Sequence, residues 1–110
     1  MFPKENRLAR ERDIKRVFEK GKRINNSLFS LLFLKNNQEL TKATVVVNKK
    51  YDKRAVYRNR LKRKFREACH NLVLSLKEPS DIIILPKKES EEIEFQELAV
   101  QLEAAFQKIK

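Results

Sequence analysis

The segment from residue 57 to residue 76 constrains the fold of this chain most strongly, because it carries an unbroken apolar stripe at helical spacing. The stripe consists of side chains that recur every three or four positions: Leu61, Phe65, Ala68, Cys69, Leu72, Val73 and Leu76. Such a stripe is typical of an amphipathic helix that packs one face on a core. The segment therefore predicts a long helix over residues 57–76 that lies on a second apolar layer.

Positive charge is concentrated at the start of this predicted helix. The chain has 110 residues and a formal net charge of +11, and ten of its 26 lysines and arginines lie in residues 49–66 beside a single acid, Asp52. Arg58, Lys62 and Arg66 follow one edge of the stripe at i, i+4 and i+8. A solvated helix face would ordinarily offer acids at i±4 to such cations, but residues 53–66 contain none. The concentration indicates a polyanionic partner, and nucleic acid is the first candidate.

The rest of the chain predicts a mixture of helices and strands. Residues 11–20 have helical periodicity and are followed by Gly21 as a C-cap, and residues 28–34 and 43–48 are apolar or rich in valine and threonine. The two strands are separated by a polar connection of hairpin-like length, and a further short strand between residues 18 and 28 stays open. Alternation in the second strand places Thr44, Val46 and Asn48 on the more polar face, which is expected to be the uncovered side of the sheet.

A buried strand and a last helix complete the predicted order. Residues 81–85 are aspartate followed by four aliphatic residues, and Pro86 ends the run. A last amphipathic helix starts near Glu91 or Glu94 and continues to Ile109. With residues 1–7 as an extended arm, we expect residues 1–110 to form a single α+β domain.

The side chains supply no evident catalytic apparatus. The chain has one cysteine and one histidine, Cys69 and His70, which cannot complete a zinc set or a nucleophile–base pair, and Cys69 falls in the apolar stripe. Gly21 is the only glycine, so phosphate-cradling glycine loops are excluded. The acids between residues 89 and 97 lie at the start of a predicted helix, where the helix dipole favours them, so they do not indicate a carboxylate site. We therefore expect no catalytic residue and no metal site in the protein.

Cellular context and the kind of nucleic acid can also be inferred. The chain has no apolar run of membrane-spanning length, its first 16 residues are too charged for a signal peptide, and a lone cysteine fits a reducing cytoplasm. Neither a helix-turn-helix nor a zinc-finger pattern is present, and a helix start that is basic all round fits a surrounding folded RNA better than a DNA groove. An RNA partner, a cytoplasmic location and no membrane association are therefore expected.

A specific motif lies within the basic segment. Ala55 and Val56 are followed, after one spacer, by Arg-Asn-Arg at residues 58–60, an apolar residue, Lys-Arg at residues 62–63 and Arg-Glu at residues 66–67. This sequence closely resembles the signature of the bacterial ribonuclease P protein subunit. The resemblance extends outward to Phe2-Pro3, Arg7-Leu8, Val17-Phe18, Gly21-Lys22, the Val-x-Lys-Lys of residues 47–50 and the strand at residues 81–85. It covers nearly the whole chain.

The resemblance implies a fold and a division of labour. The fold would be one compact α-β-β-β-α-β-α domain, with a mixed sheet packed by helices and a left-handed β-α-β crossover, against the usual preference; it is the class of ribosomal protein S5 domain 2-like folds. The protein would assist a catalytic RNA, which uses Mg²⁺ to remove the 5′ leader of precursor tRNA endonucleolytically. Its partners would be that RNA and precursor tRNA, with no obligate protein partner.

Two RNA surfaces are implied by position in the motif. The catalytic RNA would contact the basic helix and the preceding turn at Arg58, Asn59, Arg60, Lys62, Arg63, Arg66, Lys49 and Lys50. The single-stranded leader would lie in a cleft between the first helix and the open sheet face, at Ile14, Phe18, Leu32, Val46 and Asn48. For Ile14 and Phe18 the alternative is a place in the helix core.

The chain departs from the family pattern at three places. Ile14 and Leu32 stand where the family commonly has aromatics, which would reduce stacking on leader bases to Phe18 and its neighbours. The glycine before the Ala-Val pair is replaced by the turn at residues 51–54. A ribosomal or general RNA-binding protein and a self-sufficient nuclease are the competing function classes; charge alone fits the former, and the residue inventory argues against the latter.

Overall fold

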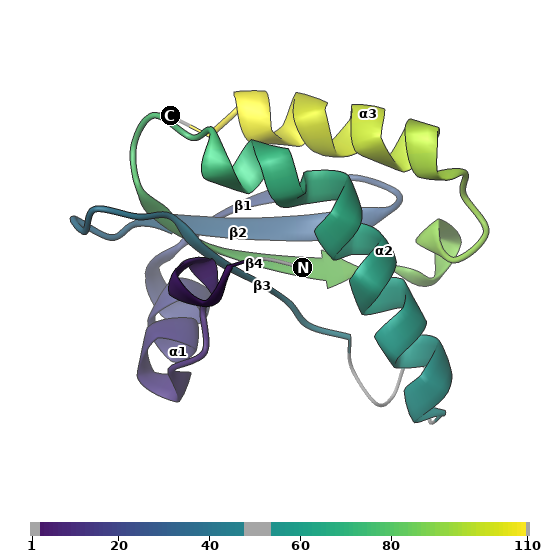
Figure 1. Ribbon diagram of the computed structural model, residues 1–110, viewed down its shortest axis with the longest axis horizontal. Coiled ribbons are helices and arrows are strands. Elements are labelled where there is room, and N and C mark those ends of the chain that lie inside the picture. The colour runs from purple at the N-terminus through teal and green to yellow at the C-terminus, as the bar shows by residue number, and fades with distance from the viewer. Residues whose placement is uncertain (1–2, 48–53, 110) are drawn as a thin grey trace.

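The computed structural model describes residues 3–47 and 54–109. Within them, the helices and strands follow the order α1 (Glu11–Lys20), β1 (Lys22–Asn25), β2 (Phe29–Lys35), β3 (Lys42–Val45), α2 (Ala55–Leu74), β4 (Ser80–Pro86) and α3 (Phe95–Gln107), with short 3-10 turns η1 (Lys4–Asn6) and η2 (Lys88–Ser90) (Figure 1). The α-β-β-β-α-β-α order implied by the resemblance is confirmed. The open question of a strand between residues 18 and 28 is answered by β1.

The sheet has four strands in the order β1-β2-β4-β3, and this order makes the predicted hairpin wrong. β4 pairs antiparallel with β2 and parallel with β3, so it separates the two strands that the sequence interpretation had joined. The reason lies in Ile82, Ile83 and Ile84, which are all fully buried. A strand that is apolar on both faces needs cover on both faces and partners at both edges, and only a central position provides these.

The connection from β3 through α2 to β4 is a left-handed crossover. In Figure 1, α2 lies above the sheet, both strands run from left to right, and the chain steps from β3 at the front to β4 behind it. A right-handed crossover would step in the opposite direction. The handedness implied by the resemblance is therefore present.

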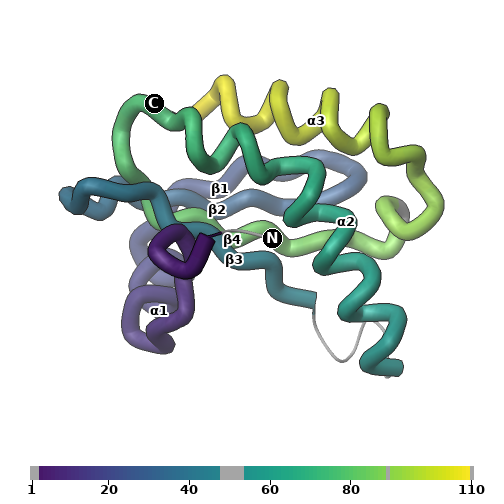
Figure 2. The backbone as a smooth tube through the Cα atoms, in the orientation of Figure 1, coloured from purple at the N-terminus to yellow at the C-terminus, as the bar shows by residue number. Residues whose placement is uncertain are grey.

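Helices cover both faces of the sheet. α2 and α3 pack on one face, where Phe65 of α2 meets Phe29 of β2 edge to face with ring centroids 6.0 Å apart. α1 lies on the other face, where Val17 packs with Leu32 and Ile83. Figure 2 shows this arrangement, with α2 and α3 above the sheet and α1 below it. The face that carries Thr44 and Val46, expected to be uncovered, is thus partly covered by α1, and both side chains are half-buried.

The N-terminal segment is tied to the edge strand β3. Lys4–Asn6 forms one 3-10 turn, in contrast to the extended arm expected for residues 1–7. The buried Asn6 donates its Nδ2 to the carbonyl of Thr41 at 2.8 Å, and Leu8 N donates to Ala43 O at 3.0 Å. The buried amide fixes this turn, so Arg7 runs beside β3 as a parallel bridge to Ala43.

Gly21 ends α1 as predicted, but for a steric reason. Its φ of −71° is extended backbone, and its N–H donates to Val17 O at 2.8 Å. A Cβ at this position would lie 2.5 Å from Val17 O and 3.1 Å from Phe33 O. The glycine therefore permits the close approach of the end of α1 to β2.

Candidate nucleic-acid interface

The apolar stripe of α2 divides its cations into separate groups. Leu61, Phe65, Cys69 and Val73 are buried against the sheet and α3, as the periodicity predicted. Burial raises the pKa of the Cys69 thiol to about 12, so this cysteine is a core residue and not a nucleophile. Because 3.6 residues make one helical turn, the cations of the first half of α2 point in several directions around the stripe.

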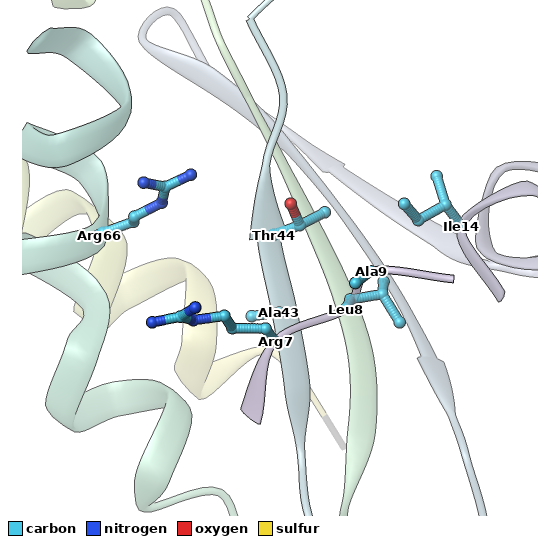
Figure 3. Close-up of a pocket in the computed structure, with 7 residues that line it drawn as sticks. All are labelled: Arg7, Leu8, Ala9, Ile14, Ala43, Thr44 and Arg66. Carbon is cyan, nitrogen blue, oxygen red and sulfur yellow. The ribbon is translucent and has the colours of Figure 1, made fainter. Parts of the chain in front are cut away.

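Arg58, Lys62 and Arg66 form a row along one edge of the stripe. All three are half-buried, as their i, i+4, i+8 spacing beside the stripe requires. Arg66, at the end of the row, reaches from α2 toward β3 (Figure 3). The row therefore leads from the start of α2 toward the edge of the sheet.

Asn59, Arg60 and Arg63 form the outward face of the same helix and are exposed. With Val56 they line a shallow hollow of about 340 Å³. This face carries two guanidinium groups, each of which can donate two parallel hydrogen bonds to a phosphate. It also carries an amide that can both donate and accept hydrogen bonds.

Lys64 belongs to neither group, although it lies between Arg63 and Phe65 in the sequence. Its Nζ donates to the carbonyls of Ser90, at 3.3 Å, and of Ile93, and so ties α2 to the segment before α3. Lys64 is one of the ten cations of residues 49–66, for which the sequence indicates a polyanionic partner. The structure gives it an internal structural role.

A pocket of about 400 Å³ lies between α1, β3 and α2 (Figure 3). It is lined by Arg7, Leu8, Ala9, Ile14, Ala43, Thr44 and Arg66. Arg7 and Arg66 stand on the α2 side, Thr44 lies on the strand between, and Ile14 projects from α1 on the opposite side. One wall is therefore cationic and the other apolar, which suits a nucleotide with its charged phosphate and its apolar base face.

The residues implied for the leader cleft lie in different environments. Ile14 lines the pocket and is half-buried, and Val46 packs against the same buried cluster on the α1 side of the sheet. Phe18 is 46% exposed on α1, so it is not a core residue, and it does not line this pocket. Leu32 is only 3% exposed and lies in the core under α1, where it supports the helix.

Three of the residues implied for RNA contact, Asn48, Lys49 and Lys50, lie outside the described residues. Of the residues that line the pocket, only Ile14 and Arg66 were implied for RNA contact; the polar lining residues Arg7 and Thr44 were not. Both had a weak signal in the sequence, since Arg7 belongs to the N-terminal match and Thr44 to the more polar strand face. Neither signal could bring them together, because their proximity depends on the bridge between Arg7 and Ala43.

The donor groups needed for a resident metal do not gather in the part of the chain that the structure describes. Among the described residues, histidine, cysteine, aspartate and glutamate side chains form no group of three or more that could hold a metal ion. Mg²⁺ in proteins is usually bound through one or two carboxylates together with water and phosphate oxygens, so what the described residues lack is a cage built from protein ligands alone. None of the helices in the described part of the chain is both long enough and apolar enough to span a membrane.

Comparison with known proteins identifies the family. A family model described as Ribonuclease P matches residues 2–110. The chain belongs to the ribonuclease P protein family. It is 35% identical to the ribonuclease P protein component of a Pseudanabaena species over 111 residues, an alignment that covers 100% of this chain and 96% of that relative. It is 36% identical to the ribonuclease P protein component of Thermotoga maritima over 94 residues, which cover 84% of this chain and 80% of that relative.

Solved structures of the ribonuclease P protein family share the fold. The RNase P protein from Thermotoga maritima superposes with a TM-score of 0.83 at 29% identity, covering 94% of this chain and 97% of that one. A Staphylococcus aureus RNase P protein, a mutant with defective mRNA degradation activity, superposes with a TM-score of 0.81 at 25% identity, with 94% and 87% covered. As a ribonuclease P protein component, this chain takes part in tRNA processing and associates with ribonuclease P RNA.

Proposed function

We propose that residues 1–110 form a single RNA-binding domain that holds the catalytic RNA on α2 and the 5′ leader of precursor tRNA in the pocket between α1, β3 and α2. In this proposal the RNA subunit performs the Mg²⁺-dependent cleavage that gives the mature 5′ end of tRNA. The protein acts in the cytoplasm, needs no further protein partner and contributes binding and positioning.

The first half of α2 supports the contact with the catalytic RNA. Its outward face carries Asn59, Arg60 and Arg63, and its edge carries Arg58, Lys62 and Arg66. Residues 53–66 themselves contain no aspartate or glutamate. Phosphates of a folded RNA would neutralise this cluster, and each phosphate bound would steepen the salt dependence of binding by about 0.7–0.9 in slope.

The pocket supports the contact with a single-stranded leader. Arg7 and Arg66 can bind phosphate oxygens, while Ile14 offers an apolar contact to a sugar or base. Phe18, exposed on α1, offers an aromatic surface outside the pocket itself. Since Leu32 is buried and Ile14 is aliphatic, aromatic stacking on leader bases would rest on Phe18, outside the pocket.

Catalysis by the RNA agrees with the side chains available. Cys69 is buried with a pKa of about 12, so its thiol is not available as a nucleophile. The observation that carries the proposal is the row from Arg58 to Arg66, because it joins the exposed basic face of α2 to the pocket beside β3.

Reconstitution with bacterial ribonuclease P RNA tests the proposal. At low Mg²⁺, adding the protein should bind the RNA and accelerate removal of the leader, and Arg66→Ala should weaken binding of precursor tRNA. Arg23→Ala is the matched control, since Arg23 is an exposed arginine on β1 at the opposite edge of the sheet from β3. Failure to bind this RNA, or co-purification with ribosomal particles in its place, would refute the proposal. Leader cleavage that persists after all RNA is removed would assign catalysis to the protein.

A further inference from the structure

Tyr57 is an exposed aromatic residue on an otherwise cationic surface. It lies in the first turn of α2 at the spacer position of the Arg-Asn-Arg motif, and 40% of its surface is exposed. Its neighbour Val56 is 65% exposed. The guanidinium of Arg54 lies over this ring, and the part of the ring that is left exposed adds an aromatic stacking surface to the charge of the arginines.

Two arginines fix the ring of Tyr57. The Cζ of Arg54 lies 3.9 Å from the ring centroid, and that of Arg60 lies 5.6 Å from it. Both distances are within the range of cation–π attraction. The ring is therefore held in a defined orientation before any ligand arrives, which lowers the entropy lost on binding.

The ring and the outward hollow of α2 share one residue. Arg60 lies near the ring of Tyr57 and also lines the hollow with Val56, Asn59 and Arg63. A nucleotide whose base stacks on Tyr57 would therefore have guanidinium groups close by for its phosphates. The arrangement combines the two elements of single-strand recognition, an aromatic platform and an adjacent cationic surface.

We propose that Tyr57 stacks on an unpaired base of ribonuclease P RNA and so adds a contact with a base face to the phosphate contacts of α2. This inference rests on the proposed function, because it requires that α2 bind that RNA. The competing role for Tyr57 is a local one, in which the ring only holds Arg54 at the start of the helix. A local role would lower stability when the ring is removed and would leave a folded variant's affinity for RNA unchanged.

The salt dependence of binding separates stacking from charge. Tyr57→Leu should bind ribonuclease P RNA about 5- to 150-fold more weakly, the equivalent of the 1–3 kcal/mol that stacking on one base contributes. Because no cation is lost, the slope of affinity against salt should stay that of the unsubstituted protein. Tyr57→Phe keeps the ring and should bind within about twofold of the unsubstituted protein. Circular dichroism and thermal melting would establish that both variants are folded.

A fluorescence measurement gives a direct readout. The chain has no tryptophan, so Tyr57→Trp would introduce a single indole at the proposed stacking position. Its emission should be quenched when ribonuclease P RNA is added to saturation. Unchanged emission at saturation, or a Tyr57→Leu variant that binds as tightly as the unsubstituted protein, would overturn the inference and leave the proposed function standing. If the unsubstituted protein does not bind this RNA, both are overturned.

Discussion

Arg7 and Arg66 line one pocket from the same side, although one precedes α1 and the other lies in the middle of α2. The bridge from Arg7 to Ala43 brings the N-terminal segment to β3, and packing of α2 on the sheet brings Arg66 to the same strand. Opposite them stands Ile14 of α1. Three separate elements thus build a pocket with a charged wall and an apolar wall, an asymmetry compatible with the charged phosphates and apolar base faces of a single RNA strand.

Removal of an outward arginine should reduce the salt dependence of RNA binding. Arg63→Ala removes an exposed guanidinium from α2, so we expect weaker binding of ribonuclease P RNA and a slope lower by about 0.7–0.9. Filter binding at four or more salt concentrations would measure both quantities. Arg23→Ala, on β1, should leave the slope unchanged; an unchanged slope in Arg63→Ala itself would mean that Arg63 does not contact a phosphate.

Substitution of the neighbouring Lys64 should lower the stability of the protein and leave the salt dependence of RNA binding unchanged. Lys64→Met removes the donor to the carbonyls of Ser90 and Ile93, and we expect the free energy of unfolding to fall by about 1–3 kcal/mol. Urea denaturation would measure the loss. The salt slope of RNA binding by the folded variant should stay unchanged. A stability equal to that of the unsubstituted protein would show that the two carbonyls are satisfied without this lysine.

Phe18→Ala should separate binding of the leader from stability. Because Phe18 is 46% exposed, its loss should change the melting temperature little, while precursor tRNA should bind more weakly and mature tRNA as before. Val17→Ala on the same helix is the contrasting variant, since Val17 is fully buried and its truncation should cost about 1.5–3 kcal/mol of stability. Equal weakening for both tRNAs would argue against a leader contact.

Gly21→Ala should destabilise the protein although the backbone conformation suits alanine. The added Cβ would lie 2.5 Å from Val17 O, so the end of α1 must move away from β2, at a cost of about 1–3 kcal/mol. Glu19→Ala, at an exposed position of α1, should change stability by less than about 0.5 kcal/mol. Chemical denaturation of the two variants would test the comparison, and a neutral Gly21→Ala would contradict it.

Asp81 should make stability depend on pH. Burial raises the pKa of this carboxyl above its usual value of 3.8, against the opposing effect of the hydrogen bond from Asn36 Nδ2 at 2.9 Å. A carboxyl whose pKa is higher in the folded state favours folding when it is protonated, so its contribution is lost as pH rises through the folded pKa. Asp81→Asn keeps an oxygen that can accept from Asn36 and removes the titration.

The expected result is a difference curve. As pH is lowered from 7 toward 4, the free energy of unfolding of the unsubstituted protein should rise relative to that of Asp81→Asn, because only the former takes up a proton at this position. Denaturation of both proteins across that range would measure it. A difference that is constant with pH, or one that changes in the other direction, would contradict the raised pKa.

The helices could be predicted closely because their signals are local. The apolar residues of the first helix recur at helical spacing, and the predicted span agrees with α1, Glu11–Lys20. The long helix was placed two residues late at each end, since α2 is Ala55–Leu74. The pairing of β2 with β3 was wrong because the sequence separation of two strands says nothing about a third strand, β4, that is apolar enough to require the centre of the sheet.

Among the candidate site residues, too, local features could be predicted from the sequence and contacts with distant segments could not. Local spacing placed Arg58, Lys62 and Arg66 along one edge of a helix, and the structure has them in that row. It could not separate Lys64 from its neighbours, because that lysine is distinguished only by carbonyls that lie beyond β4 in the chain. Nor could it show that Leu32 is buried, since its cover comes from α1.

The sequence by itself determined where the cations are concentrated, that they start an amphipathic helix, and that the chain carries the ribonuclease P protein motif. These properties depend on residues that are neighbours along the chain. Only the tertiary structure decided that β4 separates β2 from β3 and that Arg7, Ile14 and Arg66 surround one pocket. It also decided that Tyr57 is partly exposed, with Arg54 over its ring and Arg60 nearby. The physical reason is that burial on both faces of a strand, and the solvent exposure of a given ring, depend on elements distant in sequence that pack together only in the folded chain.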